Sequence, residues 1–183
     1  MVKAGDVLEH PVTGEKIVFR QTAEATNGEL MKVDFSIEPH GFVAAEHVHP
    51  VQEERFEVIS GEVTFSVQGV QRKVHSGEIV TIPPGTPHNW WNSSAQEAQL
   101  VVEVRPALQL AEFFETFFGL AQAGKVDKKT GLPSLLMMAV ILREFNREIR
   151  LAQPPAPVQK ILFGVLAQIG HLRGYKARYP YPR

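Results

Sequence analysis

Two stretches of this sequence predict the fold of the chain. Residues 41–61 read GFVAAEHVHPVQEERFEVISG, and residues 77–92 read GEIVTIPPGTPHNWWN. In both, histidines stand among apolar residues, and glycine or proline marks the places where a strand would turn or end. We therefore expect short β-strands that carry ionisable side chains toward an apolar interior.

Three histidines of these stretches are candidate metal ligands. His47 and His49 are two residues apart, so on one strand their side chains point to the same side. His88 follows a rigid turn, Pro83-Pro84-Gly85-Thr86-Pro87, and shares its side with Trp90. Two imidazoles from one strand and a third from a distant strand could close around one cation.

A carboxylate completes the candidate set, and strand parity selects it. Counting from His49 favours Glu53, but Pro50 lies between them, and proline commonly interrupts a strand or marks a bulge. Parity is better taken from the strand that follows, where Glu54 shares a side with Phe56 and the next apolar residue. That side must be the interior, so we expect Glu54 to point inward and Glu53 outward.

The donor set of three nitrogens and one oxygen suits Fe, Mn, Co, Ni, Cu or Zn better than Mg or Ca. A metal that prefers six ligands would keep two positions for water or substrate, which is typical of a working site. We expect one divalent transition metal on His47, His49, Glu54 and His88, with Phe56 and Trp90 as walls of a substrate pocket.

Alternating apolar and polar residues extend this strand pattern from about residue 15 to residue 105. The inward positions include Met31, Val33, Phe35, Ile37, Phe56, Val58, Val63, Phe65, Val67, Leu100, Val102 and Val104. Turn signals such as Asn27-Gly28, Ser60-Gly61 and Gln68-Gly69 separate the strands. Many short strands at this spacing favour a sandwich or a barrel.

After Pro106 the apolar period becomes helical. Three apolar stripes predict three helices that pack beside the barrel as a cap or a dimer element: Leu110, Phe113, Phe114, Phe117 and Ala121; Leu135, Met138, Leu142, Phe145 and Ile149; and Val158, Ile161, Leu162, Val165, Leu166, Ile169 and Leu172. We therefore divide the chain into a barrel over residues 1–105 and a helical extension over residues 106–183.

The spacing Gly41-x5-His47-x-His49-x4-Glu54-x6-Gly61 resembles the first motif of the cupin superfamily, and Gly77-x5-Pro83-x-Gly85-x2-His88-x3-Asn92 resembles the second. The two motifs cover residues 41–92, and the whole chain resembles small single-barrel cupins of bacterial type. The resemblance implies a mainly β fold, a cupin jelly-roll barrel followed here by about three C-terminal α-helices. It also implies a metal bound by the same four side chains, and frequent dimerisation.

The resemblance does not select one activity, because cupins include dioxygenases, oxidases, isomerases, decarboxylases, storage proteins and sugar sensors. The favoured function is a metal-dependent dioxygenase or related oxidoreductase on a small organic molecule. No free general base stands out near the ligands, which favours redox chemistry over hydrolysis. The alternative is a non-catalytic module that binds or senses a metal or a small molecule.

The composition limits the remaining options. The formal charge is −1 and there is no cysteine, which excludes thiolate metal sites and gives no basic surplus for nucleic acid. No apolar segment has the length of a signal peptide or a membrane span. We expect a cytoplasmic protein without nucleic-acid or membrane partners, and a homodimer.

Further residues receive a structural interpretation. His10, His40, His75 and His171 lie outside the motifs and are expected on the surface or in turns. Phe113, Phe114, Phe117 and Phe118 form a wide stripe, which favours packing onto the barrel, with a dimer interface as the second interpretation. The tail over 173–183 combines basic residues with tyrosine and proline, which suggests an extended arm across the protein or a neighbour.

Overall fold

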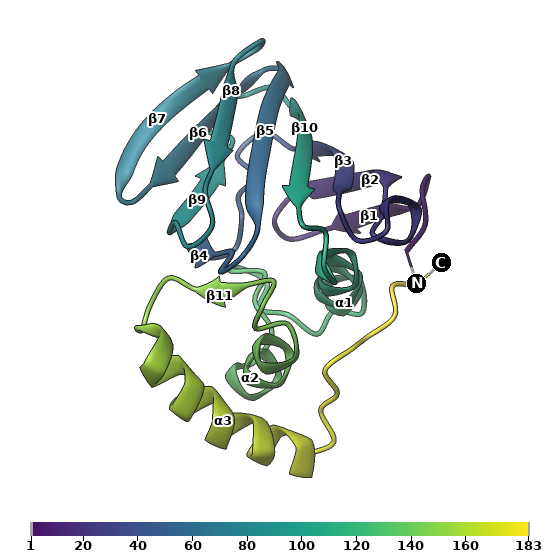
Figure 1. Ribbon diagram of the computed structural model, residues 1–183, viewed down its shortest axis with the longest axis vertical. Helices are drawn as coiled ribbons and strands as arrows, with labels where there is room; N and C mark the ends of the chain where they lie inside the picture. Colours follow the sequence, from purple (N-terminus) through teal and green to yellow (C-terminus); the bar gives the residue numbers. More distant parts are fainter. Residues whose placement is uncertain (1, 183) are drawn as a thin grey trace.

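The computed structural model describes residues 2–182 and confirms a mainly β fold with two antiparallel sheets and three helices (Figure 1). The six-stranded sheet runs in the order β1 (Val7–His10), β2 (Glu15–Gln21), β3 (Met31–Ile37), β10 (Ala98–Arg105), β5 (Glu53–Ser60) and β8 (Ile79–Ile82). The five-stranded sheet runs in the order β11 (Arg150–Leu151), β4 (His47–Val48), β9 (His88–Trp91), β6 (Glu62–Val67) and β7 (Val70–His75). A short 3-10 turn, Glu24–Thr26, precedes β3.

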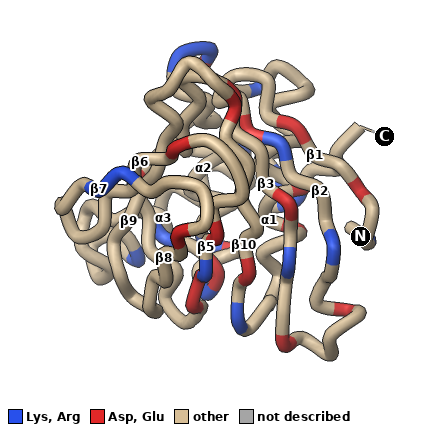
Figure 2. The backbone as a smooth tube through the Cα atoms, turned by 90° about the horizontal axis from the view of Figure 1, so that it is seen from above, with Lys and Arg blue, Asp and Glu red and all other residues tan. Residues whose placement is uncertain are grey.

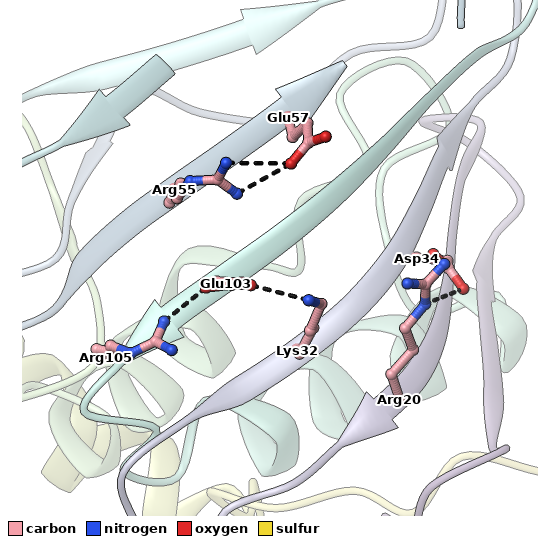
Figure 3. A network of polar contacts seen from close by, with 7 residues as sticks. All are labelled: Arg20, Lys32, Asp34, Arg55, Glu57, Glu103 and Arg105. Carbon is pink, nitrogen blue, oxygen red and sulfur yellow. Dashed lines mark hydrogen bonds and ion pairs between the residues drawn. The ribbon is translucent and has the colours of Figure 1, made fainter. Parts of the chain in front are cut away.

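The period-two alternation of the sequence separates the two faces of the six-stranded sheet. On its outer face, Lys32 Nζ lies 2.9 Å from Glu103 Oε1, and Arg105 Nη1 lies 2.7 Å from Glu103 Oε2 (Figure 3). Figure 2 shows acidic and basic residues interspersed along these strands. Surface ion pairs of this kind contribute at most about 1 kcal/mol each. Their charged groups make the outer face of the sheet polar.

The inner faces of both sheets form an aromatic core. Phe35 and Trp90 lie with ring centroids 4.8 Å apart, and Phe56 and Phe65 lie 5.1 Å apart. All four rings are buried. Because β3, β5, β6 and β9 each contribute one ring, the core joins the two sheets across the barrel interior.

The three helices are α1 (Leu110–Gln122), α2 (Leu135–Glu144) and α3 (Ala156–Leu172). Helix α1 packs on β1, and its Phe113, Phe117 and Phe118 are buried, which confirms the interpretation of this stripe as packing onto the barrel. None of the described helices is both long and apolar enough to span a bilayer.

Helix α2 ends earlier than its sequence pattern predicts. The apolar stripe continues to Ile149, but the helix stops at Glu144. The chain then turns and forms β11, in which Leu151 pairs with His47. Pairing with a barrel strand therefore overrides the local helical periodicity. The boundary at residue 105 stays a prediction, and β11 places two residues from beyond it in the five-stranded sheet.

The apolar stripe of α3 is not the face that packs on the rest of the chain. The helix packs on α2 through Gln159, Phe163, Ala167 and Gly170, whereas most of the predicted apolar stripe is exposed. At Gly170 an added Cβ would lie 2.7 Å from Val140 Cγ2 and 3.0 Å from the Leu136 carbonyl oxygen. Ala167 and Gly170 are small enough to let the two helices approach closely, so α3 packs on α2 through the side that carries them.

Two other expectations concern His10 and the tail. His10 is buried rather than at the surface, because α1 covers β1 and places Phe117 and Phe118 within 5.4 Å of its ring, centroid to centroid. His40, His75 and His171 are exposed, as expected.

The C-terminal tail runs back across the helices to β1 (Figure 1), and Tyr181 accepts a hydrogen bond from the Glu9 amide. Arg183 lies outside the described residues.

The close approach at Gly170 leads to a stability prediction. Gly170→Ala should lower the free energy of unfolding by about 1–3 kcal/mol, because the new methyl group overlaps α2. Gly164→Ala in the same helix is the matched control. Its Cβ would meet only Arg143 Nη1 at 3.6 Å, so alanine should be neutral or stabilising by up to about 1 kcal/mol. Urea unfolding followed by circular dichroism measures both, and equal effects would contradict the packing described.

Candidate metal centre and cavity

The structure brings together the four side chains that the sequence selects. His47 lies on β4, His49 directly after it, Glu54 on β5 and His88 at the start of β9. The pairing of β4 with β9 sets His47 opposite His88. Glu54 is buried and Glu53 is exposed, so the parity argument that selected Glu54 is confirmed.

The four side chains converge tightly. One potential ligand atom from each lies within 4.8 Å of the others, and all four residues are buried. Glu54 Oε2 is 2.8 Å from His88 Nε2, and Glu54 Oε1 is 3.4 Å from His49 Nε2. Two ligand atoms that are each about 2.0–2.2 Å from one ion lie at most about 4.4 Å apart. The 2.8 and 3.4 Å separations already suit a shared ion, and any pair near the 4.8 Å limit would close by a few tenths of an ångström on binding.

Backbone carbonyls fix the orientation of all three imidazoles. His47 Nδ1 lies 2.9 Å from the Ala45 oxygen, His88 Nδ1 lies 3.0 Å from the Thr86 oxygen, and His49 Nδ1 lies 2.6 Å from the Glu148 oxygen. A carbonyl oxygen only accepts, so each Nδ1 must donate its hydrogen. The Nε2 lone pair of each neutral ring is then available for a metal, an arrangement typical of histidine ligands.

Two buried atoms test whether a metal fits this cluster. Glu54 Oε2 and His88 Nε2 face each other at 2.8 Å, yet neither makes a hydrogen bond of acceptable geometry among the described residues. With Nδ1 carrying the hydrogen of His88, both atoms are acceptors, and two buried acceptors in contact are unfavourable. A cation between them satisfies both, so these residues fit a divalent metal.

The pKa values show how strongly the cluster is coupled. Burial, followed by the neighbouring His88 and His49, holds the pKa of His47 well below its usual value. Burial acts to raise the pKa of Glu54, but the imidazoles around it lower that pKa to about 2. Burial also opposes protonation of His88, yet its contact with Glu54 raises the pKa of His88 overall. The carboxylate therefore stays charged and attracts one cation, a proton or a metal.

A cavity of about 90 Å³ adjoins the cluster. His47, His49 and Glu54 form part of its wall. The rest is mainly apolar and comes from the barrel and from α1 and α2, including Met31, Val33, Phe35, Phe56, Trp90, Val102, Val104, Leu110, Phe113, Phe117, Met138 and Leu142. The two predicted pocket walls, Phe56 and Trp90, both lie in this lining. Their contact with a substrate stays a prediction.

Glu15 is a polar cavity residue that sequence reasoning missed. It lies on β2, is buried, and shares the inward face with Ile17 and Phe19. Thr13 Oγ1 donates a 2.6 Å hydrogen bond to Glu15 Oε2. Its parity with Ile17 and Phe19 was a readable signal. The cavity lining is mainly apolar, as expected, but Glu15 adds one carboxyl group that the sequence analysis did not single out.

Two more residues support the cluster from outside it. Gln52 is buried, and its Nε2 donates to the carbonyl oxygens of Pro106 and Ala107 at 2.9 and 3.0 Å. This fixes Gln52 Oε1 3.3 Å from His49 Nδ1. Together with the Glu148 carbonyl, Gln52 ties the orientation of His49 to the chain after β10.

Comparisons with known proteins agree with this architecture. Residues 33–104 match the family model described as Cupin domain. A protein named oxidoreductase from Arthrobotrys oligospora is 33% identical over 93 residues, which cover 46% of this chain and 36% of that protein. The match thus spans about a third of the relative's length.

Two solved structures are similar to part of this chain at low sequence identity. A predicted oxalate decarboxylase from Thermotoga maritima has a TM-score of 0.51 and 14% identity, over 58% of this chain and 98% of that one. A sugar phosphate isomerase from Silicibacter pomeroyi has a TM-score of 0.46 and 18% identity, over 51% of this chain and 60% of that one.

The antiparallel barrel holds a buried cluster of three histidines and one glutamate that could bind a metal ion. The family match covers the strands that carry all four of these side chains. Residues 33–104 of this chain are therefore a cupin domain.

The buried carboxyl of Glu15 leads to a pH prediction. Burial raises its pKa from 4.5 to about 7, although the bond from Thr13 opposes this. The folded chain therefore holds the proton of Glu15 more tightly than the unfolded chain does. The contribution of this proton to the free energy of unfolding is fully present below about pH 4.5 and is lost as the pH rises to about 7. The Glu15→Gln side chain cannot ionise, so the variant should not lose stability in this way. The free energy of unfolding of the variant minus that of the native chain should therefore rise by about 2 kcal/mol between pH 5 and pH 8.

Urea unfolding at several pH values measures this difference. Thr13→Val provides a matched variant, because removing the donor should move the transition to higher pH. A pH-independent difference between Glu15→Gln and the native chain would contradict the buried position of the carboxyl.

Proposed function

We propose that this chain is a metal-dependent oxidoreductase, of the dioxygenase type, that acts on a small organic molecule in the apolar cavity. The observation that carries the proposal is the position of the cluster: His47, His49 and Glu54 form part of the cavity wall. A site that opens onto a cavity differs from a structural metal site, whose ligands enclose the ion.

The ligands would be Nε2 of His47, His49 and His88 and the carboxylate of Glu54. A bound divalent transition metal would supply a Lewis acid or redox centre with open coordination positions. The protein's part is to hold the four donors rigidly, since carbonyl oxygens fix the three rings and β5 fixes the carboxylate. Rigid donors reduce the reorganisation that binding and reaction would otherwise require.

The remaining cavity residues would select and place the substrate. Phe56 and Trp90 offer flat apolar surfaces, which suits an aromatic or otherwise planar molecule. Glu15 offers the cavity a carboxyl group whose Oε2 is held by Thr13. Near neutral pH this group can donate or accept one proton, so it is a candidate hydrogen-bonding partner for a substrate oxygen.

The name of the Arthrobotrys oligospora relative, oxidoreductase, supports redox chemistry in general terms. It does not identify a substrate. A binding or sensing module is the second candidate, since a mostly apolar cavity next to a metal can also retain a ligand without changing it. The cytoplasmic location and the lack of nucleic-acid and membrane partners stay predictions.

Metal content tests the first half of the proposal. The chain, stripped with a chelator and reloaded, should bind one Fe, Mn, Co, Ni, Cu or Zn ion per chain, measured by elemental analysis and calorimetry. Glu54→Gln and His88→Ala should each weaken binding at least about tenfold, because the first replaces a charged carboxylate with a neutral amide and the second removes a nitrogen ligand. His75→Ala is the control, since His75 is exposed and outside the cluster. Equal affinity in all variants would contradict the assignment.

Oxygen consumption tests the second half. Each metal-loaded form is screened with catechols, flavonols, thiols and β-diketones in an oxygen electrode, with product analysis. The proposal expects uptake with at least one pair of metal and substrate, and its loss in Glu54→Gln. A compound that binds tightly and is recovered unchanged from every metal-loaded form would instead assign the chain to the binding modules.

A further inference from the structure

Helix α3 carries an exposed apolar stripe along its whole length. Ile161 is 72% exposed, Val165 56% and Leu172 89%. Val158, Leu162 and Ile169 are exposed as well. These six residues, which we call the α3 stripe, offer several hundred Å² of apolar surface, an amount that usually marks an interaction site.

The described part of the chain leaves this stripe uncovered. Gln159, Phe163, Ala167 and Gly170 form the buried face of α3, and that face packs on α2. Figure 1 shows α3 at the outer edge of the helical half, with α2 on its inner side. The stripe thus faces away from the molecule's own core.

The shape of the stripe fits one further helix. At 100° per residue, its six positions span about 100° of the helix circumference, the width of a helix–helix contact. The only ionisable side chains on α3 are Lys160 and His171, and both positions lie outside that arc. A helix that binds a flat anionic membrane surface usually has a broader apolar face with lysine and arginine beside it, which α3 lacks.

Five of the six residues of the stripe are placed symmetrically along the helix, and Leu162 is the exception. Val165 is at its centre, Val158 and Leu172 lie seven residues to either side, and Ile161 and Ile169 lie four residues to either side. When two such helices run antiparallel, each member of these pairs meets its counterpart on the other helix. An isologous contact about a two-fold axis requires this property.

We propose that two copies of this chain pair through the α3 stripe, with the helices antiparallel and the two-fold axis at Val165. Ile161 of each copy then packs against Ile169 of the other, and Val158 against Leu172. A standard interface buries roughly 800 Å² per partner, so residues that flank the stripe must join it in the contact. This assembly is independent of the metal centre and goes beyond the proposed activity.

Sedimentation and light scattering of the full chain test the proposal. The native chain should be a dimer at micromolar concentration, and Val165→Glu should raise the dimer dissociation constant at least about a hundredfold, because it buries two facing charges. Lys160→Glu is the matched control on the same helix, outside the stripe, and should stay dimeric. Circular dichroism checks that each variant is folded. A monomeric native chain at 100 µM, or a Val165→Glu variant that is folded and still dimeric, would overturn the proposal.

Crosslinking tests the geometry without background, because the chain has no cysteine. Val165→Cys should form a covalent dimer with a short bismaleimide. Val158→Cys alone should not, since its two copies would lie about 21 Å apart along the axis, whereas a mixture with Leu172→Cys should crosslink. Efficient self-crosslinking of Val158→Cys would show a parallel pair and overturn the arrangement.

Binding to phosphatidylserine vesicles tests the other possible occupant of the stripe. A monomer that binds such vesicles, and loses this binding in Val165→Glu, would assign the stripe to a membrane and overturn the proposal.

Discussion

The candidate metal centre depends on the contact between one buried carboxylate and three imidazoles whose Nδ1 hydrogens point away from it. Each Nδ1 donates to a backbone carbonyl, so each Nε2 turns its lone pair toward Glu54. The approach of Glu54 Oε2 to His88 Nε2 at 2.8 Å without a hydrogen bond is the clearest sign of this constraint. The imidazole lone pairs and the carboxylate oxygens are all electron-rich, and such atoms converge stably inside a protein only when a cation lies between them.

The fold supplies this constraint from both halves of the chain. Strands β4, β5 and β9 position the side chains, but the carbonyl that orients His49 belongs to Glu148, 99 residues further along. Strand β11 follows at once and pairs with β4. The helical half therefore does more than cover the barrel: it contributes to the orientation of a candidate ligand and, through α1 and α2, to the apolar wall of the cavity.

Much of the barrel and of the candidate centre was predictable from local rules. Alternation assigned the inward faces of β3, β5 and β10, and parity with Phe56 distinguished Glu54 from Glu53. The same rule applied to β2 would have found Glu15, whose carboxyl lies on the side of Ile17 and Phe19. The signal for Glu15 was therefore present in the local sequence, outside the two ligand motifs.

Other features had no local signal. Residues 145–151 continue a helical pattern but form a turn and β11, because pairing with β4 is a long-range interaction. On α3, the apolar stripe did not show which face α2 covers, because α2 packs where Gly170 and Ala167 permit a close approach. Periodicity shows which residues avoid water, but it does not show whether the chain itself or a partner covers them.

The most direct measurement is a crystal structure of the metal-loaded protein with anomalous scattering recorded at the metal's absorption edge. The account predicts one peak per chain inside the barrel, about 2.0–2.2 Å from Nε2 of His47, His49 and His88 and from a carboxylate oxygen of Glu54. A peak elsewhere, or a metal-loaded chain in which any of the three Nε2 atoms turns away from the ion, would contradict it.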